Sequence, residues 1–176
     1  AGQEVPSAAI DAITAAQADD GSWGFTGDPT APGDSNTTAL AIQALAAAGA
    51  GDDAIAAGLA YLATVRDANG AVGYDAASVA SGGDANSTAL AIQAVTAAGE
   101  DPASWEGGDL ITALAAFQND SGAFQFQPAM PDDSMLATVQ AIPALLGEPL
   151  PIRPIAAPYA AAAAEATETL PTCDFV

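Results

Sequence analysis

The stretch from Gln17 to Phe25 reads QADDGSWGF, and a related pattern returns twice further along the chain. Residues 66 to 74 read RDANGAVGY, and residues 118 to 126 read QNDSGAFQF. Counted between the central glycines Gly21, Gly70 and Gly122, the spacing is 49 and then 52 residues. A period of this size is typical of helical-hairpin repeats. We therefore predict three copies of one structural unit.

A second repeated block follows each of these loops. Residues 34 to 49 read DSNTTALAIQALAAAG, and residues 84 to 99 read DANSTALAIQAVTAAG, with 12 of 16 positions identical at an offset of 50. The third block, DSMLATVQAIPALLG from Asp133 to Gly147, keeps the pattern but few of the letters. Internal duplication is therefore a conclusion from the sequence itself.

The composition favours an all-α fold in one domain. Half of the 176 residues are apolar, and most of these are alanine, which favours closely packed helices over sheets. We predict a repeat domain over residues 1–147, with units at about 7–53, 54–106 and 107–147, and six main helices in three antiparallel hairpins. Four prolines between Pro149 and Pro158 preclude a continuous helix there. Residues 148–176 are predicted to form an extended Pro/Ala-rich arm, with a short helix at 159–166.

Polar residues and glycines predict where these helices begin and end. Ser7 is expected to cap the first helix. The second helix of unit one is expected to be capped by Asp34 or Asn36, and the second helix of unit two by the matching Asp84 or Asn86. The first helices of units two and three are expected at Ala54 to Val65 and at Asp109 to Phe117. The second helices of units one and two are expected to end at Gly49 and Gly99, and that of unit three to start after Asp133. In each loop the repeated glycine is expected to have a backbone conformation unfavourable for other residues, with the side chains two and four positions later folded onto the helices.

The charge balance excludes several classes of partner. The chain has 22 acids, two bases and no histidine, for a formal charge of −20. Such a surface repels nucleic acids and anionic lipids, and no apolar run is long enough for a membrane span. It suits an extracellular or salty setting, and a start at Ala1 is compatible with a mature secreted chain. Acidity that only keeps an alanine-rich chain soluble is the alternative explanation.

The loop residues resemble a known motif. Gln17, Gly21 and Trp23 form Gln-x-x-x-Gly-x-Trp, which resembles the QW motif of squalene and oxidosqualene cyclases. The whole pattern, from about residue 7 to 147, resembles the prenyltransferase/terpenoid-cyclase repeat of α/α toroids. The resemblance implies a loop tied to helix ends by its glutamine and aromatic residue, and inner and outer rings of helices. The same toroid also occurs in cobalamin carriers and in complement thioester domains, so the resemblance indicates a fold more strongly than a function.

The chain departs from that family at several positions. Arg66 and Val72 replace the glutamine and the aromatic residue in unit two, whereas unit three keeps the motif as Gln118, Gly122 and Phe124. Three hairpins are also fewer than a closed toroid uses. The resemblance therefore implies a partial toroid, an arc that another copy would have to complete.

Candidate catalytic residues are few. Without histidine or lysine, Ser-His-Asp, Cys-His and Schiff-base chemistry are excluded, and Cys173 is the only cysteine, which leaves no disulfide framework. The acidic pairs Asp19-Asp20, Asp52-Asp53 and Asp132-Asp133 match neither the DxDD nor the DDxxD motif of terpene cyclases and have no EF-hand spacing. Turns and helix caps are the preferred interpretation of these pairs, and we predict no metal, no cofactor and no catalytic residue.

Aromatic residues and asparagines give the remaining candidate sites. Residues that could either pack the loops or line a hydrophobic cavity are Trp23, Phe25, Tyr74, Phe124 and Phe126. The asparagines that head N-x-Ser/Thr sequons, and are therefore candidate glycosylation sites, are Asn36, Asn86 and Asn119. For the first two, a structural role at a helix start is the alternative explanation.

The ends of a repeat array predict the kind of function. A terminal unit leaves an apolar face uncovered, so either the arm covers it or copies of the chain stack into a ring or filament. The first hypothesis is a non-catalytic extracellular or cell-surface module that self-associates or binds another protein. The alternatives are a carrier for a hydrophobic or corrinoid-like ligand, with the aromatic residues as its lining, and a terpenoid cyclase fragment.

Overall fold

The structure, a computed structural model, describes residues 5–151. The expected helix at 159–166, most of the arm and Cys173 lie outside the described residues. The helices are α1 (Ser7–Ala15), α2 (Ser35–Ala48), α3 (Asp52–Thr64), α4 (Ala76–Val79), α5 (Ala85–Ala97), a 3-10 turn (Trp105–Gly107), α6 (Leu110–Ala115) and α7 (Met135–Leu145). Two short strands, β1 (Gln125–Gln127) and β2 (Met130–Asp133), form an antiparallel pair.

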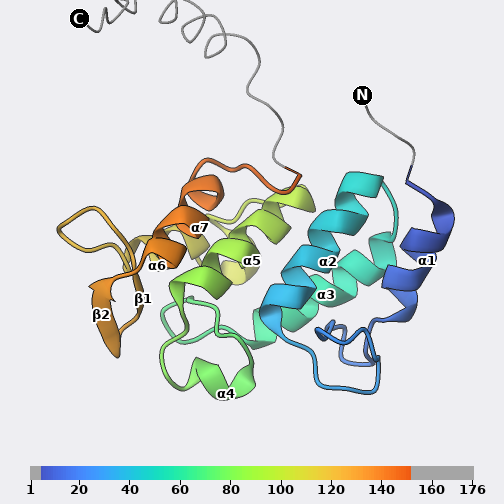
Figure 1. Cartoon of the computed structure of the whole chain (residues 1–176), viewed down its shortest axis with the longest axis horizontal. Helices are drawn as coiled ribbons and strands as arrows, with labels where there is room; N and C mark the ends of the chain where they lie inside the picture. The colour runs from blue at the N-terminus through green and yellow to red at the C-terminus, as the bar shows by residue number, and fades with distance from the viewer. Residues whose placement is uncertain (1–4, 152–176) are drawn as a thin grey trace, which may run out of the picture.

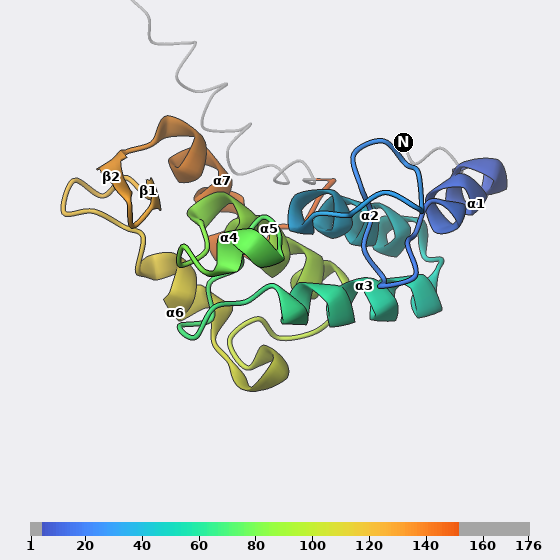
Figure 2. The ribbon, with the colours of Figure 1, turned by 90° about the horizontal axis from the view of Figure 1, so that it is seen from below.

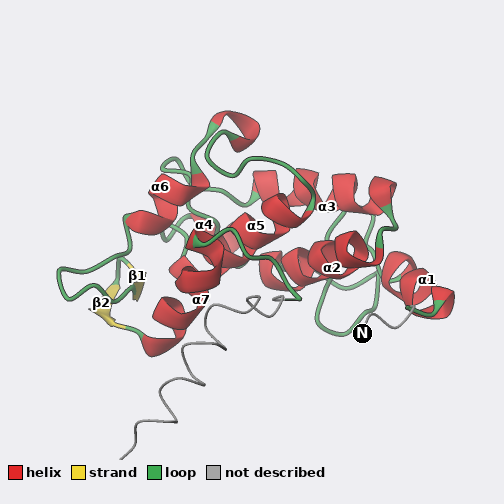
Figure 3. Ribbon diagram, turned by 90° about the horizontal axis from the view of Figure 1, so that it is seen from above, coloured by secondary structure: helices red, strands yellow, loops and turns green. Residues whose placement is uncertain are grey.

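The second helices of the three units form one row. Helices α2, α5 and α7 lie side by side with α5 in the middle (Figure 1), and α5 contacts both neighbours. Helices α3 and α6 lie on one side of this row, as Figures 2 and 3 show, and α1 contacts α2 at its end. The prediction of a mainly helical chain is confirmed, and the six expected helices are present.

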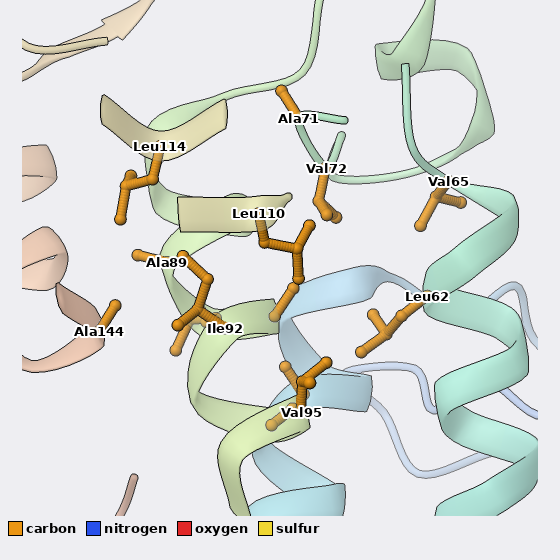
Figure 4. Packing of buried hydrophobic residues seen from close by; sticks show 14 of the residues in the cluster. Leu62, Val65, Ala71, Val72, Ala89, Ile92, Val95, Leu110, Leu114 and Ala144 are labelled. Atoms are coloured by element: carbon orange, nitrogen blue, oxygen red, sulfur yellow. The ribbon is translucent and has the colours of Figure 1, made fainter. Parts of the chain in front are cut away.

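Helix α5 is the centre of the packing. Every residue from Ala85 to Val95 is buried, because α2 and α7 flank this helix while α6 packs on it from the side. Figure 4 shows Ile92 of α5 in the same cluster of buried side chains as Leu110 and Leu114 of α6. Five of the 13 residues of α5 are alanine, and these small side chains let the neighbouring helices approach closely.

Three second helices begin in the same way. The side chains of Asp34, Asp84 and Ser134 accept hydrogen bonds from the backbone N–H three residues later, which satisfies a free donor of the first turn. Burial raises the pKa of the Asp84 carboxyl, although hydrogen bonds from Ser87 act in the opposite direction. The duplicated blocks are therefore structural equivalents, with the third beginning at Ser134.

The expected cap of the first helix was wrong, whereas other expected helix starts are confirmed. Ser7 lies inside α1 and gives no side-chain cap; Pro6 precedes the helix with φ −59°, an angle that its ring fixes and that already leads into a helix. Of the two candidate caps for each second helix, Asp34 and Asp84 are confirmed, because their carboxylates bond the free N–H groups, whereas Asn36 and Asn86 lie in the first turns of α2 and α5. The expected helix start after Asp133 is confirmed: Asp133 ends β2, and α7 begins at Met135 with Ser134 as its cap.

The β1–β2 hairpin was not expected in an all-α chain. Gln127 pairs with Met130 across a turn at Pro128 and Ala129. The turn proline cannot continue a helix, and the three-residue strand is too short to give a recognisable alternation of polar and apolar residues. The third loop is thus extended into a hairpin where the first two loops are not.

The chain after α7 returns across the row of helices. The Gln93 side-chain amide donates to the carbonyl of Glu148 at 2.7 Å, and the N–H of Leu150 donates to Oε1 of Gln43 at 2.7 Å. Gln43 and Gln93 occupy equivalent buried positions of α2 and α5. The segment 148–150 therefore forms a strap that leads from unit three back to unit one.

Candidate functional site

The three repeated loops share one set of hydrogen bonds. The N–H groups of Trp23, Val72 and Phe124 donate to the hydroxyls of Thr38, Thr88 and Thr138 at 2.9 to 3.0 Å. Each threonine hydroxyl in turn donates to the carbonyl of the capping residue four positions earlier. The central glycines have φ angles of 87°, 90° and 87°, as expected for a position that favours glycine. The duplication extends from sequence to backbone geometry.

The residues of the QW-like motif hold their loops together. The side-chain amide of Gln17 donates to the carbonyl of Gly21 at 2.9 Å, and Gln118 does the same to Gly122 at 2.9 Å. The indole N–H of Trp23 donates to the carbonyl of Ile13 at 2.7 Å, which ties the first loop to α1. These side chains therefore fix the loops through hydrogen bonds to backbone carbonyls.

The same side chains also link one unit to the next. Gln17 makes a second bond, to the carbonyl of Ala54 in α3, at 2.9 Å. In unit two Arg66 replaces the glutamine and donates to the carbonyls of Trp105 and Glu106 at 3.0 and 3.1 Å, with its guanidinium 5.2 Å from the centre of the Trp105 ring. The substitution therefore preserves the link between units with a longer side chain.

The candidate aromatic residues do not come together around a cavity. Trp23 and Phe124 are buried, and Val72 is buried at the matching position of unit two. Phe25, in contrast, is 92% exposed, Tyr74 is half-exposed and Phe126 is partly buried. The expectation that the side chains four positions after the glycine fold onto the helices was wrong for Phe25 and Tyr74, which are exposed. Phe25 lies in a turn closed by a hydrogen bond from the N–H of Gly27 to the carbonyl of Gly24 at 3.0 Å.

The sequon asparagines differ in exposure. Asn86 is buried and its side-chain amide donates to Oε1 of Gln140 on α7, so an attached sugar would have to break this contact between units. Asn119 donates to the carbonyl of Pro131 at 3.0 Å and to the carboxylate of Asp133 at 2.8 Å. Asn36 is partly buried in the first turn of α2.

The acidic pairs lie in turns and helix starts. Asp20 accepts from the N–H and hydroxyl of Ser22 at 3.0 and 2.6 Å, and Asp52 and Asp53 lie in the first turn of α3. Asp133 accepts from Asn119 and Ser121, and these bonds lower the pKa of its carboxyl. Over residues 5–151, no group of three or more His, Cys, Asp or Glu side chains is placed to hold a metal ion.

An exposed apolar stripe on α7 is the strongest candidate for an interaction surface. Ala137, Ala141 and Ala144 point into the core, while the opposite side of the helix is exposed. We call that side the forward face; it consists of Met135, Val139, Ile142 and Leu146, which are 78%, 50%, 51% and 70% exposed. Their spacing of four, three and four residues places them on one side of a helix, and grouped exposed apolar side chains mark interaction sites.

The opposite end of the array presents a second surface, which we call the backward face. It consists of Val5 just before α1, of Ala9 and Ala12 on α1, and of Leu40 and Ala44 on α2, all of which are exposed. A shallow groove between α1 and α2 reaches from Ala12 to Leu40, with Phe25 at its edge. The described array thus has apolar side chains exposed at both ends.

The sequence predicted uncovered ends but not these residues. The signal was present in α7, whose stretch MLATVQAIPAL is apolar on all sides, a composition typical of a helix with neighbours on every side. It could not be interpreted without knowing which side faces α5.

The hydroxyl group of Tyr61 forms a hydrogen bond between two units, and its ionisation is expected to make the stability of the fold depend on pH. Tyr61 of α3 donates to the carbonyl of Gly33 at 3.3 Å, and burial, followed by the charges of nearby carboxylates, raises its pKa to about 12. An unfolded tyrosine ionises near pH 10, so its stabilising contribution is complete below that pH and is lost between pH 10 and 12. We expect Tyr61→Phe to flatten the fall of the free energy of unfolding over this range, as measured by urea denaturation. An equally steep fall in the variant would contradict the assignment.

Comparison with known proteins adds no relative. No protein-family model, curated protein or solved structure matches this chain. In the described part of the chain, no helix combines the length and apolar character needed to cross a membrane.

Proposed function

We propose that this chain is a non-catalytic protein-interaction module that acts through the forward face of its third unit, by self-association or by binding another protein. One observation carries this proposal. Ile42 and Ile92 are completely buried, whereas Ile142, at the equivalent position of α7, is 51% exposed. Among residues 5–151, the third unit has the side chains of an internal repeat without a neighbour that covers them, as expected at the end of an array.

We also propose that the three units form an arc of the α/α toroid type. The shared loop hydrogen bonds and the row of second helices support this arrangement. An extracellular or cell-surface location fits the formal charge of −20, which keeps a chain with apolar ends soluble. A carrier function has less support, because Trp23 and Phe124 are separately buried and Phe25 points into solvent.

The two methionines of the chain provide a test with an internal control. Met135 lies on the forward face, and Met130 lies outside it on β2; they are 78% and 54% exposed. Because the protein itself consumes hydroxyl radicals, the readout is the ratio of oxidation at Met135 to oxidation at Met130. We expect this ratio to fall severalfold as protein concentration rises from micromolar to millimolar. A constant ratio, together with a monomeric mass at every concentration, would refute self-association through this face.

A charged double variant extends the test. Val139→Asp/Ile142→Asp places two carboxylates on the forward face, and we expect it to abolish the protection of Met135. Ala60→Asp is the matched control, since Ala60 is exposed on α3 and Asp11 already occupies the equivalent position of α1. This control is expected to associate like the original chain.

A further inference from the structure

The chain contains the same unit-to-unit contact twice, and each end exposes one half of it. On the forward side, Ala39 and Ile42 of α2 and the equivalent Ala89 and Ile92 of α5 are completely buried where the next unit follows. Val139 and Ile142 are the equivalents in α7, at an offset of 50 residues. The forward face is therefore the half of the contact that a further unit would cover.

The backward side follows the same rule. Ala54, Gly58 and Tyr61 of α3 are buried against unit one, and a Cβ atom added to Gly58 would lie 2.8 Å from the Trp23 ring and 3.0 Å from Ile42. The equivalents 49 residues earlier are Val5, Ala9 and Ala12, and all three are exposed. The first unit thus exposes the half of the contact that would cover a preceding unit.

The hydrogen bonds that link consecutive units show the same gap. Gln17 and Arg66 donate to the carbonyls of Ala54 and Glu106, which are equivalent positions 52 residues apart. Gln118 is exposed, and among residues 5–151 its side chain donates only to the carbonyl of Gly122. The acceptor at the equivalent position of unit one is the carbonyl of Val5.

The space around the central glycines also differs between the internal units and the last unit. A Cβ atom on Gly21 would lie 2.3 Å from the carbonyl oxygen of Ala57 in the next unit, and one on Gly70 would lie 3.6 Å from the Cβ atom of Ala113, whereas one on Gly122 would meet nothing within 4 Å. Ala8 is the residue of unit one that corresponds to Ala57, 49 residues earlier. Gly122 therefore leaves open the space that the backbone of a following α1 would occupy.

We infer that the forward face of one copy binds the backward face of a second copy, head to tail, with the geometry that already joins the units inside the chain. This inference rests on the proposed function and specifies its partner. In the complex, Gln118 donates to the carbonyl of Val5, the α7 stripe covers Ala9 and Ala12, and α1 lies over Gly122. Contacts of this kind join different surfaces of two copies, so they either close into a ring or propagate.

Two further observations favour a second copy over the chain's own arm or an α7-to-α7 dimer. The strap leads the chain away from the forward face, since Leu150 already bonds to Gln43 of α2. An α7-to-α7 dimer would leave Gln118 and the backward face without partners. Met135–Leu145 contains no acidic residue, so repulsion comes from more distant charges, and added salt is expected to tighten the association by screening them.

Mixing two variants tests this arrangement directly. Val139→Asp/Ile142→Asp disables the forward face, and Ala12→Asp disables the backward face, while each variant keeps the other face intact. We expect sedimentation velocity of the full-length chain to show each variant alone as a monomer and their equimolar mixture as a 1:1 complex of twice the monomer mass. Circular dichroism of each variant checks that it is folded, and the Ala60→Asp control is expected to self-associate without a partner.

The outcomes separate the inference from the proposed function. If Ala12→Asp alone associates like the original chain while the α7 variant does not, the head-to-tail arrangement is wrong but the forward face remains the interaction surface. If the original chain is monomeric at all concentrations and salt levels, the inference is overturned. A mixture that stays monomeric, when the original chain associates, also overturns it.

Discussion

Replacing Ile92 by alanine is expected to lower the free energy of unfolding by about 2 to 5 kcal/mol, which is the range for large-to-small substitutions in packed cores. Ile92 is completely buried at the centre of α5, where helices on several sides prevent the site from collapsing around the lost atoms. Urea denaturation followed by circular dichroism measures this change, seen as a lower midpoint with an unchanged slope.

The internal repeat supplies the matched control. Ile142→Ala removes the same atoms at the equivalent position of α7, where the side chain is 51% exposed. We expect a cost of at most about 1 kcal/mol when the chain is monomeric, since little burial is lost. A cost equal to that of Ile92→Ala in dilute monomer would show that α7 is covered within a single chain, contrary to the proposed forward face.

Replacing Gly21 by alanine is the second change for which we expect a large effect, a loss of about 3 kcal/mol or more. Its φ of +87° alone costs an L-residue about 1 to 2 kcal/mol. The added Cβ would also lie 2.3 Å from the carbonyl oxygen of Ala57, so α3 would have to move away from the loop, and overpacking of this kind adds about 1 to 3 kcal/mol. Thermal unfolding of the variant measures the combined effect.

Gly122→Ala separates the two contributions. Gly122 has the same φ of +87° and no atom within 4 Å of an added Cβ, so only the conformational cost of about 1 to 2 kcal/mol applies to the monomer. In the head-to-tail complex the new methyl group would meet the next copy, so we expect association to weaken at least tenfold. Equal destabilisation by both substitutions in the monomer would show that the contact with Ala57 is unimportant.

Much of the fold was predictable because its determinants are local. The capping aspartates Asp34 and Asp84 and the glycines of the three loops act through bonds to residues a few positions away. Gln17 and Gln118 likewise bond carbonyls four residues along the chain. Because each such feature occurs at matching positions, the repeat could be recognised although no solved structure matches.

The remaining features depend on distant neighbours and could not be derived from the repeat alone. Asn86 heads a sequon as Asn36 does, but α7 lies over it and supplies Gln140. Phe25 matches Phe126 in the sequence but differs from it in exposure, because the loops diverge after the shared hydrogen bonds. The forward face was hidden for the same reason, since only the position of α5 shows which side of α7 is left uncovered.

The strap over Gln43 and Gln93 is expected to affect the order in which the repeats unfold. In an open stack, each repeat is stabilised only by its nearest neighbours, and terminal repeats fray before the centre does. Here the bonds from Glu148 and Leu150 connect the last repeat to the middle and the first, so α7 cannot detach from α5 without releasing a contact with α2. The strap therefore couples the two ends of the array and makes its unfolding more cooperative than three stacked hairpins alone would allow.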